Sequence, residues 1–249
     1  MEKNKTVRIF SDTDGAVDFI IKRWSEIAIE AVKNKGSFSV ALSGGKTPAA
    51  LYDRLCLHTK DIPWEKTQIF LVDERFVPAG SPESNYHLIE EHLLNHVSVP
   101  RENVHGVITG GTTHEDAASM YEEQLQRFFS VEDGFAGFDL VMLGIGYDGH
   151  TASLFPGWDD LHQKERLIVP VTADIFPFKR ITMTSKVINN ARHIIFFVTG
   201  RHKAKIVQRI IEDRNTVLPA ALAEGHTGEL IYVLDSAAAS FLKRDQARQ

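Results

Sequence analysis

The sequence predicts a single α/β domain over residues 1–249, with a Rossmann-like, mostly parallel sheet that carries helices on both faces. Short apolar segments that favour strands alternate along the chain with longer amphipathic segments that favour helices. The expected strands are apolar throughout rather than at alternate positions, as in parallel sheets that are buried on both faces. No internal repeat and no long Pro-, Gly- or Ser-rich linker divides the 249 residues, so one domain is expected.

The expected elements follow one another with clear boundaries. Apolar segments predict strands at 7–10, 38–42, 68–72, 138–143, 180–184, 193–199 and 229–235. Helical spacing of apolar residues predicts helices at 13–34, from about 48, at 84–97, 113–129, 201–213 and 219–225, and from 236 onward. Ser84 and Thr113 are suitable N-caps, and Gly36 is a suitable stop signal for the first helix.

Composition narrows the class of protein. Hydrophobic residues make up 43% and charged residues 24%, and the net charge of −5 argues against nucleic acid or a membrane surface as the main partner. The single cysteine, Cys56, allows neither an intrachain disulfide nor a thiolate metal cluster, and it suits a reducing cytosol. The start "MEKNKTVRIF" lacks the apolar run of a signal peptide, and no segment approaches the roughly 20 apolar residues of a membrane span. We therefore expect a cytoplasmic protein, either a monomer or a dimer.

Polar, glycine-rich or charged segments follow four of the expected strands. They are "SGGKTP" (43–48), "DERFVP" (73–78), "GIGYDGHTASLFPG" (144–157) and "GRHKA" (200–204). In an open parallel sheet, the loops at the carboxyl ends of the strands converge on one crevice, where ligands bind. The four segments are therefore expected to form one site.

The first of these segments has the composition of an anion-binding loop. Glycines let the backbone approach a ligand, while the free N–H groups of the following helix point at it. A nucleotide P-loop would need a glycine six residues before Lys46, and that position holds Val40, so the expected guest is a phosphate other than a nucleotide. The alternative is a tight turn without a ligand. The groups expected to bind are Ser43, Gly44, Gly45 and Thr47.

The third segment presents His150 and Asp148 on a turn rich in glycine. A histidine titrates near neutral pH and can act as a general base or acid. An aspartate two residues away can orient its ring or stabilise its charged form. The alternative is a structural or merely solvated histidine, but its place between glycines and a Ser/Thr-rich stretch favours a catalytic role.

Cations accompany the other segments. Arg75 ends the "DER" triplet, Arg180 opens a strand, and Lys203 lies in the first turn of a helix. A guanidinium can grip a phosphate or carboxylate with two hydrogen bonds. Positive charge at a helix start is unfavourable, and a bound anion would offset it. Local ion pairs are the alternative explanation.

Taken together, these segments resemble the 6-phosphogluconolactonases, within the group that includes glucosamine-6-phosphate isomerase/deaminase. The matching pieces are "ALSGGKTP", "DERFVP" with "SNYHLI", "FDLVMLGIGYDGHTASLFPG", "RITMT", "VTGRHKA" and "LPAALA", in order from residue 41 to about 222, with a later "IYVLDSAAAS". The arginine of "DER" and the "TASLFPG" tail indicate the lactonase branch. The sequence departs from the family pattern at Lys46, where serine is frequent, and at "PFKR", where a Lys-Pro-Pro-like approach to Arg180 is common.

The resemblance implies hydrolysis of 6-phospho-D-glucono-1,5-lactone to 6-phosphogluconate, a step of the oxidative pentose phosphate pathway, without a metal or an organic cofactor. His150 is then the expected base and Asp148 its positioning partner. Arg75 could meet either the phosphate or the reacting end. The expected phosphate anchor comprises Ser43, Gly44, Gly45, Thr47, Arg180 and Lys203.

Two other functions stay open. A sugar-phosphate isomerase or deaminase would share the phosphate site and use Asp73 as its candidate base. A sugar-phosphate sensor without catalytic activity would bind such a ligand and not turn it over. The polar segment 157–166 is a candidate lid in any of these functions.

Overall fold

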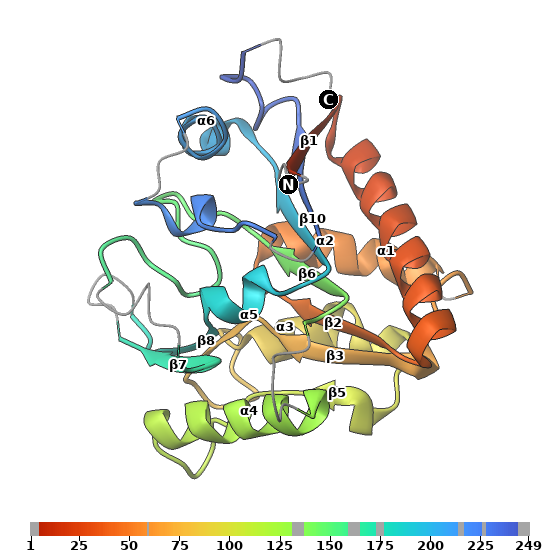
Figure 1. The fold of residues 1–249 in the computed structure, drawn as a ribbon, viewed down its shortest axis with the longest axis vertical. Helices are drawn as coiled ribbons and strands as arrows, with labels where there is room; N and C mark the ends of the chain where they lie inside the picture. The colour runs from red at the N-terminus through yellow and green to blue at the C-terminus, as the bar shows by residue number, and fades with distance from the viewer. Residues whose placement is uncertain are drawn as a thin grey trace.

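The computed structural model describes residues 5–58, 60–130, 137–158, 165–172, 177–213, 217–225 and 228–243. Within them, a seven-stranded sheet runs through the molecule with all its strands parallel (Figure 1). The strand order is β1-β10-β9-β6-β2-β3-β5. The strands are β1 (Lys5–Phe10), β2 (Phe38–Leu42), β3 (Thr67–Leu71), β5 (Val104–His105), β6 (Leu140–Leu143), β9 (His193–Val198) and β10 (Glu229–Asp235).

Helices lie on both sides of this sheet, as the sequence predicts. In Figure 1, α1 lies on one side of the sheet and α6 on the other. The α-helices are α1 (Thr13–Lys35), α2 (Lys46–Leu55), α3 (Asn85–His92), α4 (His114–Phe129), α5 (Ser185–Asn189) and α6 (Ala204–Ile211). Short 3₁₀ turns lie at Cys56–His58, Trp64–Lys66, Leu94–His96, Arg101–Asn103, Arg201–Lys203 and Pro219–Ala221.

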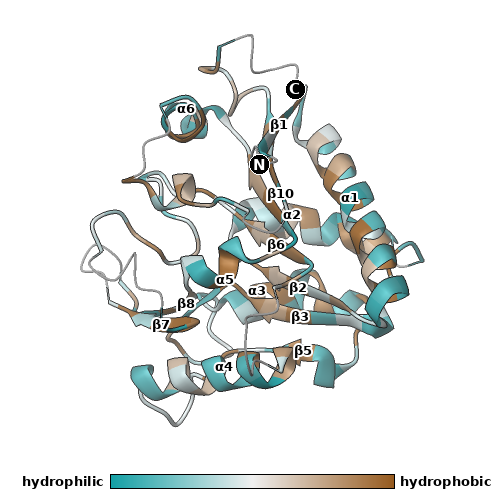
Figure 2. Ribbon diagram, in the orientation of Figure 1, coloured by the Kyte–Doolittle hydropathy of each residue, from teal (hydrophilic) through white to brown (hydrophobic). Residues whose placement is uncertain are grey.

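The core consists of two main layers because successive residues of a strand face opposite sides of the sheet. On β2, Val40 and Leu42 belong to the cluster under α1, α2 and α3, whereas Ala41 belongs to the cluster under α4, α5 and α6. Figure 2 shows the apolar strands at the centre and helices whose outer faces are hydrophilic. Burial on both faces explains why β2, β6 and β9 carry apolar residues at consecutive positions.

The predicted capping residues are confirmed. The Ser84 side chain accepts a hydrogen bond from the N–H of His87 at the start of α3, and Thr113 does the same for Asp116 at the start of α4. Gly36 ends α1 in the left-handed region, at φ 81°. Such caps satisfy backbone groups that have no partner inside the helix.

The strand predicted at 180–184 is present, but it lies outside the parallel sheet. β8 (Arg180–Met183) pairs antiparallel with β4 (Asp73–Arg75) and with β7 (Ile168–Val171), forming a second sheet of three strands. The sequence analysis took the segment of β4 as a loop and missed β7 and the two-residue β5. Short strands leave little periodicity to detect, and their pairing depends on distant residues.

Some helix boundaries also differ from the predictions. α2 begins at Lys46 rather than near Pro48, although the proline still lies in its first turn. The helix predicted at 84–97 ends at His92, and a separate 3₁₀ turn follows. The helix predicted from 236 is wrong, because residues 236–241 form turns. The candidate lid at 157–166 falls largely on residues 159–164, which lie outside the described residues. No helix among the described residues has the length and apolar character that a membrane span requires.

Strand order places the loops after β2 and β6 next to each other. β2 and β6 are neighbours, and the chain proceeds from β2 towards β3 on one side and from β6 towards β9 on the other. Such a point of reversal opens a crevice at the carboxyl ends of the strands. The two segments that the sequence singles out as a phosphate loop and a histidine turn meet there.

Candidate functional site

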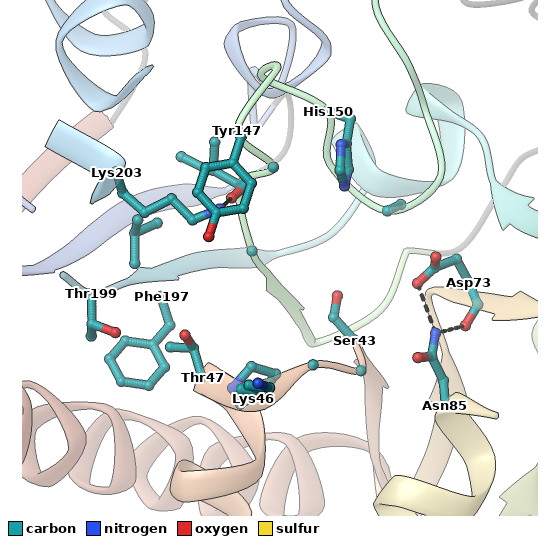
Figure 3. Close-up of a pocket in the computed structure, with 18 of the residues that line it drawn as sticks. Ser43, Lys46, Thr47, Asp73, Asn85, Tyr147, His150, Phe197, Thr199 and Lys203 are labelled. Atoms are coloured by element: carbon teal, nitrogen blue, oxygen red, sulfur yellow. Dashed lines mark hydrogen bonds between the residues drawn. The ribbon is translucent and has the colours of Figure 1, made fainter. Parts of the chain in front are cut away.

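A cavity of about 380 Å³ lies at this point of reversal. Both sheets and the start of α3 contribute to its wall. Figure 3 shows many of the side chains that line it. Every residue that the sequence analysis expects in the site lines this cavity except Asp148. The carboxylate of Asp148 instead contacts Nδ1 of His150. The lining residues include Ser43, Gly44, Gly45, Lys46, Thr47, Asp73, Arg75, Asn85, Gly146, Tyr147, His150, Arg180, Thr199 and Lys203.

The loop after β2 offers main-chain N–H groups to the cavity. Gly45 occupies the N-cap position of α2 at φ 118°, in a region that favours glycine, and no side chain caps this helix. The hydroxyl of Ser43 donates to the carbonyl of Met142 at 2.8 Å, so it ties the loop to β6 instead of pointing a donor at a ligand. The N–H groups at the start of α2 are therefore the donors that suit an anion here.

Only glycine fits at position 44 because a neighbouring side chain lies too close for a Cβ atom, and not because of its backbone angles. A Cβ atom added at Gly44 would lie 1.9 Å from Oδ1 of Asn85, a separation that no side chain tolerates. Asn85 is 1% exposed and donates from Nδ2 to the main-chain carbonyl of Asp73 at 2.8 Å. The loop can thus approach α3 closely only because Gly44 has no side chain.

The start of α3 is held by a buried carboxylate. Glu74 on β4 accepts hydrogen bonds from the hydroxyl of Ser84 and from the main-chain N–H groups of Arg75, Asn85 and Tyr86. Burial raises the pKa of Glu74, and the donated hydrogen bonds offset part of that rise. This network orients Asn85 at the base of the cavity.

Asp73 carries a carboxylate whose two oxygens both have partners. Its Oδ2 accepts from the hydroxyl of Ser153 at 2.6 Å and lies 3.9 Å from Nη1 of Arg180, while Oδ1 accepts from Asn85 at 3.2 Å. The residue is 6% exposed, and Figure 3 shows it beside Asn85 at one end of the cavity. These contacts fix the orientation of the carboxylate.

Two arginines face each other across the small sheet. Arg75 on β4 is directly opposite Arg180 on β8, and like charges at opposed positions of antiparallel strands repel. Burial lowers the pKa of Arg180; the Asp73 carboxylate opposes that shift, and the charge of Arg75 adds to it. Nη1 of Arg75 donates a hydrogen bond to the carbonyl of Glu83 at 2.7 Å. A bound anion would relieve the repulsion between the two guanidinium groups.

The turn after β6 orients His150 into the cavity (Figure 3). Nδ1 of its ring lies 2.6 Å from Oδ1 of Asp148, which also accepts from the His150 main-chain N–H at 3.1 Å. Burial alone would raise the pKa of Asp148, but the hydrogen bonds and charge of His150 outweigh it and lower the pKa below its usual value. Because an ionised carboxylate favours the proton on Nδ1, the neutral ring would present Nε2 as an acceptor.

Glycine and strained backbone make this turn possible. A Cβ atom at Gly146 would lie 2.1 Å from Nδ1 of His150, so the ring packs directly against bare backbone. Ala152 adopts a left-handed conformation at φ 51°, which is uncommon for a residue with a side chain and occurs often at functional sites. The imidazole also contacts the ring of Phe155, at a centroid distance of 5.0 Å and an interplanar angle of 60°.

Lys203 contacts the same turn from the start of α6. Its Nζ donates to the carbonyl of Ile145 at 2.6 Å and lies 3.9 Å from the ring centroid of Tyr147. Burial lowers the pKa of Lys203, and the Asp148 charge partly offsets this. Figure 3 shows Lys203 at the end of the cavity near Thr47, away from Asp73.

The cavity thus has two chemically different ends. One end combines Lys203, Thr47 and the N–H groups of α2, which suit a multiply charged anion. At the other end Arg180 lies over Phe155 at 5.8 Å, the same ring that packs against His150. A ligand held by its charge at the first end would extend towards a base and a guanidinium at the second.

Sequence reasoning missed Asn85, Tyr147 and Ser153 as parts of this site. A signal existed for Asn85, because "SNYHLI" follows "DERFVP" and was already a matching family segment. Tyr147 and Ser153 lie within the segment 144–157, but only the tertiary contacts give them partners. Within the described residues, no group of three His, Cys, Asp or Glu side chains is arranged to hold a metal ion.

Known proteins resemble this chain over most of its length. Residues 11–232 match the family model described as Glucosamine-6-phosphate isomerases/6-phosphogluconolactonase. A 6-phosphogluconolactonase from Synechocystis sp. is 39% identical, over 86% of this chain and 88% of the relative, and one from Nostoc sp. is 36% identical, over 96% and 98%. The structure of 6-phosphogluconolactonase from Trypanosoma cruzi superposes with a TM-score of 0.84 at 28% identity, covering 98% of each chain.

Proposed function

This chain belongs to the Glucosamine-6-phosphate isomerases/6-phosphogluconolactonase family, and we propose that it hydrolyses 6-phospho-D-glucono-1,5-lactone to 6-phospho-D-gluconate. The observation that carries the proposal is the meeting of the His150–Asp148 pair and an anion site in one cavity of about 380 Å³. That volume suits a single small sugar derivative. The reaction would serve the oxidative pentose phosphate pathway, in the cytoplasm, within one catalytic domain.

Hydrolysis begins with water at the lactone carbonyl. Nε2 of His150 takes a proton from the water as its oxygen bonds to C1, and Asp148 stabilises the imidazolium that forms. The bond between C1 and the ring oxygen then breaks, and the imidazolium returns its proton to the departing ring oxygen. Positioned proton transfer of this kind typically contributes on the order of 10² to 10⁴ in rate.

The cations take separate roles in this proposal. Lys203, Thr47 and the main chain at Gly44 and Gly45 hold the 6-phosphate, so that binding energy far from the carbonyl orients it against His150. The sequence placed Arg180 with the phosphate. Its contact with Phe155, which also packs on His150, supports a role at the reacting end, where its charge would stabilise the oxyanion.

Arg75 fits the same end as Arg180, because the two lie opposite each other on β4 and β8. Lys46 is exposed at the first position of α2 and faces the cavity, so it would add a solvated charge beside the phosphate. A solvated cation of this kind contributes less than a partly buried one.

The isomerase alternative has less support than the lactonase proposal. The relatives from Synechocystis sp. and Nostoc sp., at 39% and 36% identity, both carry the name 6-phosphogluconolactonase. Incubation with glucosamine 6-phosphate is therefore expected to release no ammonia. Ammonia release would favour the deaminase branch instead.

The test of the proposal is a proton-release assay with freshly generated 6-phosphogluconolactone, corrected for spontaneous ring opening. The protein should accelerate hydrolysis, and His150→Ala should lose most of that activity while still binding 6-phosphogluconate. His96→Ala is the matched control, because His96 is exposed and lies outside the cavity. Binding without turnover by the unmodified protein would indicate a sensor, and full activity in His150→Ala would remove the assigned base.

A further inference from the structure

Tyr147 is an exposed aromatic side chain at the mouth of the cavity. It lies between Gly146 and Asp148 in the histidine turn and is 72% exposed. Its ring nevertheless has a defined place, 3.9 Å from Nζ of Lys203 and at a centroid distance of 5.5 Å from the ring of His202. Figure 3 shows Tyr147 and Lys203 together on the wall that faces Thr47.

Two contacts of the Lys203 ammonium come from this one turn. The carbonyl of Ile145 accepts one of its N–H groups at 2.6 Å, and the face of the Tyr147 ring covers the ammonium. An aromatic face attracts a cation through its quadrupole and uses none of the directional acceptors that an anion would compete with. An ammonium has three N–H groups, so donors remain for a ligand in the cavity.

A lysine without such a contact would be a poor anchor. The Lys side chain has a flexible four-carbon stem, and holding it in one orientation costs conformational entropy. The carbonyl of Ile145 restrains the ammonium by a single bond, about which the remaining N–H groups can swing. An aromatic ring packed against the ammonium limits this rotation before the ligand binds. Less conformational entropy is then lost on binding, so the ligand binds more tightly.

We propose that Tyr147 is a positioning residue that holds the Lys203 ammonium towards the cavity and so sets the affinity for the phosphate end of the substrate. The inference rests on the proposed function, because it takes that anion to be the 6-phosphate of the lactone. The aromatic ring carries the effect, and the phenolic hydroxyl has no part in it.

The test compares Tyr147→Leu with Tyr147→Phe, which keeps the ring. Tyr147→Leu should raise KM for 6-phosphogluconolactone by roughly 3- to 10-fold, the effect of one cation–π contact at a partly exposed site, with little change in kcat. Tyr147→Phe should restore KM to the wild-type range. Phe241→Leu, at another exposed aromatic outside the cavity, is the matched control and should leave KM unchanged.

A spectroscopic measurement reports on the contact itself. The Hε resonances of Lys203, assigned by their loss in Lys203→Arg, should be displaced upfield by the ring current of Tyr147 in the full-length protein. Tyr147→Leu should return them to ordinary lysine positions, and Tyr147→Phe should not. Unchanged resonances in Tyr147→Leu, or moved resonances with an unchanged KM, would overturn the inference.

Two further arms separate the possible failures. An equal rise in KM for the phosphate-free glucono-1,5-lactone would mean that the ring touches the sugar, and it would overturn the role assigned to Lys203. If the unmodified protein hydrolyses no lactone, the proposed function fails, but the role of Tyr147 is still decided by the affinity for inorganic phosphate. That affinity should fall about 3- to 10-fold in Tyr147→Leu, and equal affinities would overturn the inference.

Discussion

In the seven-stranded sheet, the polar groups that line the cavity lie beyond the strands, whereas in the three-stranded sheet they lie on the strands themselves. The loop at 43–48 and the turn at 144–150 follow strands that are buried throughout. Asp73 and Arg75 are residues of β4, and Arg180 is the first residue of β8. The two sheets therefore supply the same site through different structural means.

The difference affects how function and stability are linked. His150 and Lys203 lie on segments outside the buried strands, so they can change without opening the core. Asp73 and Arg180 are mostly buried and face each other, and removing one leaves the other in a poorly solvated place. We expect substitutions of His150 and Lys203 to change catalysis with little effect on stability, and substitutions of Asp73 and Arg180 to change catalysis and stability together.

The largest expected effect on stability comes from Asp73→Ala. It removes the acceptor of Ser153 and Asn85 and the carboxylate near Arg180, and breaking a buried pair from one side costs about 3–5 kcal/mol. Thermal unfolding should show a fall in Tm of roughly 6–20 °C. Asp53→Ala is the control, because its ion pair with His92 is exposed and should contribute less than about 1 kcal/mol. Equal Tm values for the two variants would contradict the contrast between the sheets.

The next largest effect is a difference between two cations, because substitution of Arg180 should change kcat and substitution of Lys203 should change KM. Arg180→Ala should lower kcat by roughly 10²-fold or more, the scale of a lost oxyanion donor. Lys203→Ala should instead raise KM, by about 10-fold, because it holds the part of the substrate that does not react. Steady-state kinetics on the lactone distinguishes the two. A pure rise in KM for both variants would return Arg180 to the phosphate end.

A smaller effect tests the junction between the loop and α3. Gly44→Ala should destabilise the protein by about 1–3 kcal/mol, because the new methyl group would collide with Oδ1 of Asn85. In an Asn85→Ala background the same substitution should cost less, which a double-mutant cycle measures as coupling. Gly80→Ala is the control, since a Cβ atom there meets nothing within 4 Å. Equal costs of Gly44→Ala in both backgrounds would contradict the close contact.

The smallest effect concerns Asp148 and pH. Asp148→Asn should lower kcat, because an amide neither favours the proton on Nδ1 nor stabilises the imidazolium. The folded protein holds the pKa of Asp148 below its ordinary value of 3.8, so its contribution to stability is present above that pH and is lost as the pH falls through the folded pKa. Denaturant unfolding should therefore show a stability difference between wild type and Asp148→Asn that is constant from neutral pH to about pH 4 and narrows below. A difference that widens in acid would contradict the lowered pKa.

Much of this molecule is determined by local sequence. The spacing of apolar residues identifies the strands of the parallel sheet except β5, and most helices, and the caps at Ser84, Thr113 and Gly36 are as predicted. His150 and Asp148 were recognised as a pair because they are two residues apart on one glycine turn. Signals of this kind lie within a few residues, so they can be read without knowing the fold.

Only the tertiary structure decided which distant groups meet. Asp73 and Ser153 are 80 residues apart, and Ile145 and Lys203 are 58 apart, and no local pattern specifies either contact. The antiparallel sheet that opposes Arg75 to Arg180 also depends on pairing between short strands far apart in the chain. The sequence by itself determined the elements and their reactive residues, because those depend on near neighbours. The assignment of each cation to one end of the cavity depended on long-range packing.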